Sequence, residues 1–275
     1  MGDNMDVIEI IKDAFVFPSK NIKILLIYVV LALLAGAFSV GGTLVYILGF
    51  ITPECFMWGG IAFIVSLVIG WLLSGYLISV VKSGIDLDDE VPEFEWWKNF
   101  NTGFDNFIVS IVYFIIPAFI VLVVGFLTNV FGNILVVAQG IVLQTANVYT
   151  GSSNIFLSDA LSQAIANLIV SLAVTITVAL VVFLIFSFLQ TMAQARLANT
   201  DSLSEALNVF EAAKDIKRIG IGKVIIVILL IIVIVAVIEM ALSAIPFLSI
   251  LSVIISPYLA FFTQRAVGLL YSDIA

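Results

Sequence analysis

Histidine is absent from this sequence of 275 residues, and cysteine occurs only once, at Cys55. These absences exclude a disulfide within the chain and zinc sites built from His and Cys side chains. The sequence also contains no metal-ligand cluster, no Gly-rich phosphate loop and no Ser with a basic partner. We therefore expect no metal and no cofactor. An enzyme is the least supported class, because no acid, base and nucleophile converge in the sequence.

Charged residues are scarce as well. They make up 11% of the chain, against about a quarter in soluble domains, whereas hydrophobic residues make up 63%. Several stretches without charge exceed the roughly 20 apolar residues that a helix needs to cross a bilayer. They lie between Glu54 and Lys82, between Asp105 and Asp159, between Asp159 and Arg196, and between Glu239 and Arg265. The sequence predicts an all-α, polytopic membrane protein.

Six transmembrane helices are expected from these apolar stretches. We place them at about residues 24–39, 56–81, 107–128, within 161–195, 224–242 and 247–270. Gly41 and Gly42 are predicted to open the first connection. The polar but uncharged stretch 129–158 is predicted to be a long connection that holds a short surface or re-entrant helix at 134–143. The glycines of the first two spans favour close helix packing over ligand binding; they are Gly36, Gly41, Gly42, Gly59, Gly60, Gly70 and Gly75.

Three charged segments with apolar residues at helical spacing are predicted to be amphipathic helices in the membrane interface. The first covers residues 5–15. The second is predicted to begin near Pro92 and carries Phe94, Trp97, Phe100 and Phe104. The third opens with the capping-box pattern of Ser202 and Glu205. The first 20 residues do not resemble a cleavable signal peptide, so we expect the first span to be an uncleaved anchor.

The segments repeat in the order interfacial helix, span, connection and span ending in a basic residue. Within a single membrane domain, 1–275, this order predicts three helix-plus-hairpin pseudo-repeats at about 5–84, 90–199 and 203–271. All eleven Lys and Arg residues fall on the side that both termini share, and the opposite connections have none. Because cytoplasmic loops concentrate basic residues, we expect a cell-membrane protein with both termini in the cytoplasm.

Glu239 is the main candidate for an intramembrane polar site. It lies 16 positions after Lys223, or about 24 Å along a helix, in the fifth predicted span. A carboxylate in hydrocarbon is costly, so it usually faces a polar cavity, an ion path or a partner. Alternatively, the span ends early and Glu239 reaches water at the outer headgroups.

Lys82, Arg196 and Arg265 end the even-numbered spans and are candidate contacts for a substrate anion or for anionic headgroups. The alternative is that they extend toward the cytoplasm and only fix the topology. The nearby glutamines, Gln190, Gln194 and Gln264, are expected to form hydrogen bonds between helices. The acidic string Asp86, Asp88 and Asp89 is interpreted as a solvated loop and not as a catalytic or calcium-binding motif.

Three groups of residues resemble the pattern of a family of prokaryotic, often archaeal, membrane proteins, domain of unknown function 4013. They are Gly75-Tyr76-Leu77 to Gly84 with Val91-Pro92-Glu93-Phe94 and Trp97; Ala195-Arg196-Leu197 to Ala212; and Pro257-Tyr258 through Arg265 to Tyr271. The resemblance covers most of the chain and implies a multi-pass membrane fold. It implies no activity and no catalytic residues.

Two classes of function remain from the sequence. The first is a transporter or channel for a small solute or a lipid. The second is a membrane-organising scaffold that contacts lipids or proteins through its interfacial helices. The lipid bilayer is the expected partner, nucleic acid is not expected because the acids cluster in short connections, and protein partners and a homo-oligomer are left open.

Overall fold

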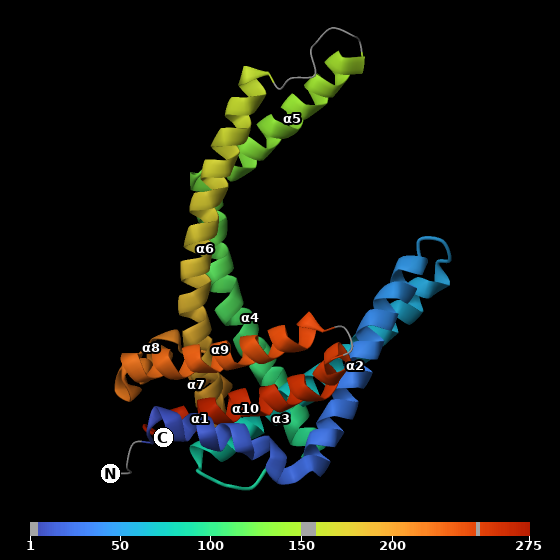
Figure 1. Cartoon of the computed structure of the whole chain (residues 1–275). Coiled ribbons are helices and arrows are strands. Elements are labelled where there is room, and N and C mark those ends of the chain that lie inside the picture. Colours follow the sequence, from blue (N-terminus) through green and yellow to red (C-terminus); the bar gives the residue numbers. More distant parts are fainter. Residues whose placement is uncertain (1–4, 150–157, 246–247) are drawn as a thin grey trace. The chain divides into compact units, whose positions relative to one another are not determined.

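The structure is a computed structural model that describes residues 5–149, 158–245 and 248–275. These residues form helices and no strands (Figure 1). The helices are α1 Val7–Val16, η1 Phe17–Asn21, α2 Ile22–Leu48, α3 Glu54–Ile85, α4 Trp96–Leu127, α5 Val130–Tyr149, α6 Asp159–Thr200, α7 Leu203–Ala206, α8 Val209–Ile219, α9 Ile221–Ala244, η2 Leu248–Leu251 and α10 Ser252–Tyr271. Six helical segments in this part of the chain are long and apolar enough to cross a membrane, which confirms the all-α, six-span prediction.

The chain divides into two compact units. One comprises Met1–Ser110 and Leu189–Ala275, and the other comprises Ile111–Phe188. The division cuts through α4 and α6, so each of these long helices contributes one part to each unit. The predicted single membrane domain and its three pseudo-repeats stay predictions.

The first unit is organised around aromatic side chains from α2, α3 and α10. Tyr28, Tyr76 and Phe261 are buried, and their ring centroids lie 5.0 to 6.0 Å apart. Tyr76 stacks on Phe94 with the centroids 4.7 Å apart, and its hydroxyl donates a hydrogen bond to the Pro92 carbonyl at 3.0 Å. Burial of these large aromatic surfaces, with the Tyr76 hydroxyl hydrogen-bonded, stabilises this junction. The segment after α3 is thereby held against α3 itself.

Glycine permits the closest helix contacts in this unit. A Cβ atom at Gly75 would overlap the backbone carbonyl of Asn99, and one at Gly84 would lie 2.9 Å from Cα of Gly268. Gly42 and Gly59 also meet a facing helix, which fits the predicted packing role. Four of the other predicted glycines, Gly36, Gly41, Gly60 and Gly70, face open space instead.

In the second unit α5 packs against α6 through small polar side chains. The Thr128 and Thr175 hydroxyls are hydrogen-bonded at 2.9 Å, and the Asn133 amide donates to the Ser171 hydroxyl at 3.1 Å. The prediction of a connection with a short helix at 134–143 is therefore wrong in extent, because α5 runs for 20 residues. The polar composition of this stretch had indicated a loop, but its polar side chains form hydrogen bonds between helices instead. Residues 150–157 of that stretch lie outside the described residues.

Two other predicted helix boundaries are also wrong. α2 continues through Gly41 and Gly42 to Leu48, since tertiary contact with α3 outweighs the low helix propensity of glycine. Pro92 lies in a non-helical segment, and the next helix begins only at Trp96. From Trp96 the predicted interfacial helix and the third span form one continuous α4. The predicted start of the sixth span, Phe247, lies outside the described residues.

The first and third predicted interfacial segments are separate helices. α1 is capped by Asp6 in a reciprocal capping box with Glu9, and it packs against α10 (Figure 1). The predicted capping box at Ser202 is wrong, because the Ser202 side chain makes no capping hydrogen bond and Asn208 caps α8 instead. The placement of these helices in a membrane interface stays a prediction.

Candidate functional site

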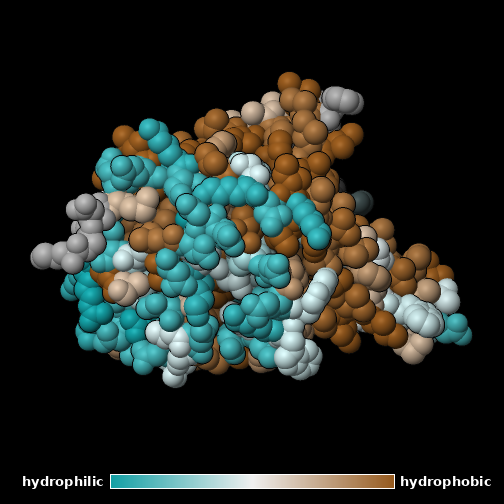
Figure 2. All heavy atoms as spheres, turned by 90° about the horizontal axis from the view of Figure 1, so that it is seen from below, coloured by the Kyte–Doolittle hydropathy of each residue, from teal (hydrophilic) through white to brown (hydrophobic). Residues whose placement is uncertain are grey.

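Hydrophilic residues gather over one area of the face drawn in Figure 2, with hydrophobic residues beside it.

The three basic residues predicted to contact anions all bind carboxylates of this chain. Lys82 pairs with Asp201 at 2.6 Å, and both side chains are partly exposed to solvent. Exposed ion pairs of this kind contribute about 0–1 kcal/mol.

Arg265 is the most buried of the three, with its side chain 1% exposed. Its Nε donates to the Asp13 carboxylate at 2.9 Å, and its Nη1 donates to the backbone carbonyls of Ser83 at 2.9 Å and Asp88 at 2.5 Å. The guanidinium lies over the Phe17 ring at 4.4 Å from the centroid. One side chain of α10 therefore joins α1, η1 and the end of α3.

Asp89 extends this cluster at its exposed edge. Lys20 donates a hydrogen bond to the Asp89 carboxylate at 2.8 Å, and this bond lowers the pKa of Asp89 below its ordinary value. Arg265 lies 3.9 Å from the same carboxylate. The carboxylate is therefore ionised at neutral pH and adds negative charge beside the guanidinium.

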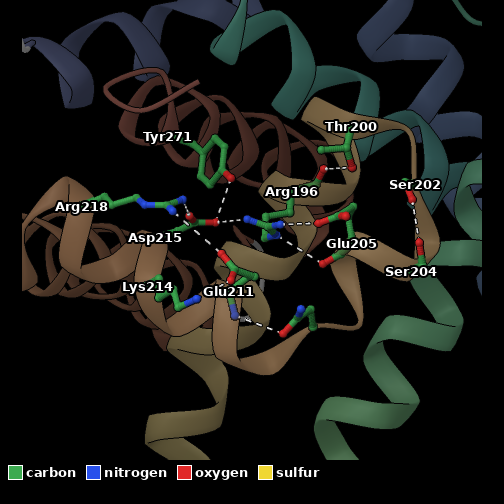
Figure 3. Close-up of polar contacts among 11 residues, drawn as sticks. Arg196, Thr200, Ser202, Ser204, Glu205, Glu211, Lys214, Asp215, Arg218 and Tyr271 are labelled. Carbon is green, nitrogen blue, oxygen red and sulfur yellow. Dashed lines mark hydrogen bonds and ion pairs between the residues drawn. The ribbon is translucent and has the colours of Figure 1, made fainter.

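Arg196 forms a second buried cluster, shown in Figure 3. Its Nη1 donates to Asp215 at 2.8 Å and its Nη2 donates to Glu205 at 2.6 Å. Asp215 is completely buried and also accepts a hydrogen bond from the Tyr271 hydroxyl at 2.9 Å. Side chains from α6, α7, α8 and α10 thus meet in one cluster, in which Arg196 binds Asp215 and Glu205, and Asp215 also binds Tyr271. The sequence pattern predicted that Glu205 belongs to a capping box, but its carboxylate binds Arg196 in this cluster.

Asp13 and Asp215 are the important residues that the sequence analysis missed. Both are acids on the apolar side of an amphipathic helix: Asp13 lies between Ile10 and Phe17, and Asp215 lies between Ala212 and Ile219, at the same spacings of three and four. All four flanking side chains are buried. A carboxylate on a buried face needs a charged partner, and this pattern is the signal that predicts one.

Glu239 lies in α9, and its carboxylate accepts a hydrogen bond from the Ser256 hydroxyl of α10 at 2.7 Å. Ser256 also lines an open groove between α2 and α10 with a volume of about 580 Å³. Small residues of α2, such as Gly36 and Ala37, form the opposite wall, and Ser252 adds a second hydroxyl. The Glu239 carboxylate thus adjoins the Ser256 wall of a mainly apolar groove. It can accept hydrogen bonds from an amine or hydroxyl group while apolar atoms of the same molecule contact the walls.

The glutamine predictions are answered in part. Gln190 of α6 donates to the Ser110 hydroxyl of α4 at 3.2 Å, which is a hydrogen bond between helices as predicted. Asn106 of α4 likewise donates to the Ser74 hydroxyl of α3 at 2.7 Å. Within the described residues, no group of three or more Asp, Glu or Cys side chains is arranged to hold a metal ion.

No curated protein and no solved structure matches the chain. A family model, described as a protein of unknown function, DUF4013, matches residues 58–247, which are 190 of the 275 residues. This multi-pass membrane chain, with its apolar helices and buried arginine clusters, belongs to the DUF4013 family of proteins of unknown function.

Proposed function

We propose that this protein binds and translocates a small amphipathic molecule, a solute or a lipid, that carries a cationic or hydrogen-bond-donating group. The observation that supports the proposal is the Glu239 carboxylate bonded to Ser256 at the edge of the groove between α2 and α10. Glu239 lies five residues before the end of the apolar helix α9, and a carboxylate in such a helix is costly to keep unless it faces water, a ligand or a path.

The charge distribution favours a cationic ligand over an anionic one. No Lys or Arg occurs between Lys23 and Lys82, between Lys98 and Arg196, or between Lys223 and Arg265. The charged residues within these three intervals are Glu54, Asp105, Asp159 and Glu239. The intervals between these basic residues therefore carry only negative charge, which attracts cations and repels anions. The three basic residues that end the even-numbered spans, Lys82, Arg196 and Arg265, are engaged with carboxylates.

Glu239→Gln tests the proposal, because glutamine keeps the shape of the side chain and removes its charge. In liposomes containing the reconstituted protein, we expect flux of amine-bearing solutes or lipids. The variant is expected to reduce this flux about ten-fold or more, since a hydrogen bond to a charged group contributes about 1.5–3 kcal/mol.

Glu54→Gln is the matched control, since Glu54 is an exposed carboxylate in the first turn of α3. It is expected to reduce the flux much less than Glu239→Gln does, because the charge of an exposed carboxylate is screened by solvent. Equal flux in wild type and Glu239→Gln, or no flux for any amine-bearing, neutral or anionic probe, would contradict the proposal. The second result would favour the alternative of a membrane-organising scaffold.

We also propose that both termini lie in the cytoplasm of a cell membrane, because every basic residue lies on their side of the predicted spans. The only cysteine, Cys55, then lies on the outer side, at the start of α3. A membrane-impermeant maleimide added to intact cells is expected to label Cys55. With Cys55→Ser and Ser272→Cys combined, labelling is expected only after permeabilisation, and the opposite pattern would reverse the orientation.

A further inference from the structure

The exposed side of α8 has no role in the proposed transport site. Asp215 and the buried residues beside it, Ala212 and Ile219, fix the inner side of the helix. Asp215 bonds to Arg196 of α6 and Tyr271 of α10. The rotation of α8 about its axis is thereby set, and the residues on its other side are held outward.

The outward residues are basic and apolar. Phe210, Lys214 and Lys217 follow one another at spacings of four and three, so they lie along one side of α8, and Ile221 is exposed at the first residue of α9. The two apolar members are strongly exposed, Phe210 at 82% and Ile221 at 53%. Lys214, Lys217 and the neighbouring Arg218 are also exposed. We refer to Phe210, Lys214, Lys217, Arg218 and Ile221 as the α8 stripe.

The charges of the α8 stripe are only partly balanced within the protein. Lys214 pairs with Glu211 at 2.5 Å, and this contact lowers the pKa of Glu211 below its ordinary value. Arg218 pairs with Asp215, whose charge is already matched by Arg196. Lys217 has no ion-pair partner among the residues that the structure describes. The stripe therefore carries excess positive charge.

The connection to α9 places the stripe next to the membrane. Gly220 is the only residue between α8 and α9, and its φ of 110° lies in a region that glycine adopts readily. α9 is one of the six helices that are apolar enough to span the bilayer. Because one residue cannot separate them far, the C-terminal end of α8 lies at the level where α9 enters the headgroup region.

We propose that the α8 stripe is a binding surface for anionic phospholipid headgroups of the same membrane. Its Lys and Arg side chains attract the phosphates, and Phe210 and Ile221 insert into the boundary between headgroups and acyl chains. A bilayer is the occupant that fits, since it offers negative charge and apolar depth together, within one residue of a spanning helix. This inference does not depend on transport at Glu239.

Retention of phosphatidylglycerol on the purified full-length protein, counted by native mass spectrometry, is the first measurement. Lys217→Gln is expected to weaken retention roughly five-fold, as each basic residue near a membrane surface contributes about 1 kcal/mol. Lys98→Gln is the matched control, because Lys98 is also exposed but lies on α4 beside Glu95. Equal retention in wild type and Lys217→Gln would overturn the proposal.

A second measurement locates the stripe directly. With Cys55→Ala removing the only cysteine, Phe210→Cys carries a fluorophore in nanodiscs of phosphatidylcholine with or without phosphatidylglycerol. Lipids brominated in the acyl chain are expected to quench this fluorophore, and more strongly when phosphatidylglycerol is present. Quenching by aqueous iodide and not by brominated lipid would show that the stripe faces water and would overturn the proposal. A change in the fluorescence when an acidic protein binds the same face would show that the stripe serves another partner.

Discussion

Replacing Arg265 with Ala is expected to lower the free energy of unfolding by about 3–5 kcal/mol, the cost of removing one partner of a buried ion pair. The substitution leaves Asp13 without its cation and removes the Arg265 donor from the Asp88 and Ser83 carbonyls, of which the Ser83 carbonyl keeps its bond from the Asp88 N–H. It also removes the contact with the Phe17 ring. Thermal unfolding in detergent micelles, followed by circular dichroism, measures the loss.

Lys82→Ala is the matched control for Arg265, since Lys82 has the corresponding position in the first predicted unit. Its pair with Asp201 is partly exposed, and we expect a loss of at most about 1 kcal/mol. Arg265→Lys keeps the charge but loses the planar group that reaches several acceptors, so an intermediate loss is expected. Similar losses for Arg265→Ala and Lys82→Ala would contradict the role of burial.

Asp215→Leu is expected to have an effect of the same size, about 3–5 kcal/mol, for the same reason. Arg196 would keep only its contacts to Glu205, and the Tyr271 hydroxyl would be left without its acceptor. Because the side chains come from four different helices, the loss should appear as a single, cooperative decrease in the unfolding temperature and not as local fraying.

A double-mutant cycle separates the interaction energy between Arg196 and Asp215 from the contacts that each residue makes with other residues. Combining Asp215→Leu with Arg196→Met replaces both charges by apolar side chains, which is often close to neutral for buried pairs. We therefore expect the double variant to be more stable than Asp215→Leu alone. Additive losses from the two single substitutions would show that Arg196 and Asp215 act independently, against the 2.8 Å contact between them.

The membrane architecture was predictable because it depends on properties that a single sequence carries. The length of an apolar, uncharged stretch decides whether a helix can cross hydrocarbon, and six segments pass that condition in the structure. Helix ends were less predictable. Gly41 and Gly42 lie inside α2, and Pro92 precedes α4 by four residues, because contacts with neighbouring helices outweigh weak local preferences.

In the candidate sites, too, some features were predictable from the sequence and others were not. Glu239, Lys82, Arg196 and Arg265 stand out in the sequence, since charges at the ends or in the middle of apolar helices are rare. Their partners do not stand out. Asp13 lies 252 positions from Arg265, and Tyr271 lies 56 positions from Asp215. Nothing in either local segment specifies which of several acids meets which arginine.

The sequence by itself determined that the chain lies in a membrane, crosses it as apolar helices and is poor in groups for metal or redox chemistry. The physical reason is that transfer of apolar and charged groups between water and hydrocarbon depends on composition along the chain. Only the tertiary structure decided that Lys82, Arg196 and Arg265 are bound by carboxylates and that Glu239 meets Ser256 beside a groove. Those contacts depend on the rotation and depth of each helix, which are set by side-chain packing between segments far apart in the sequence.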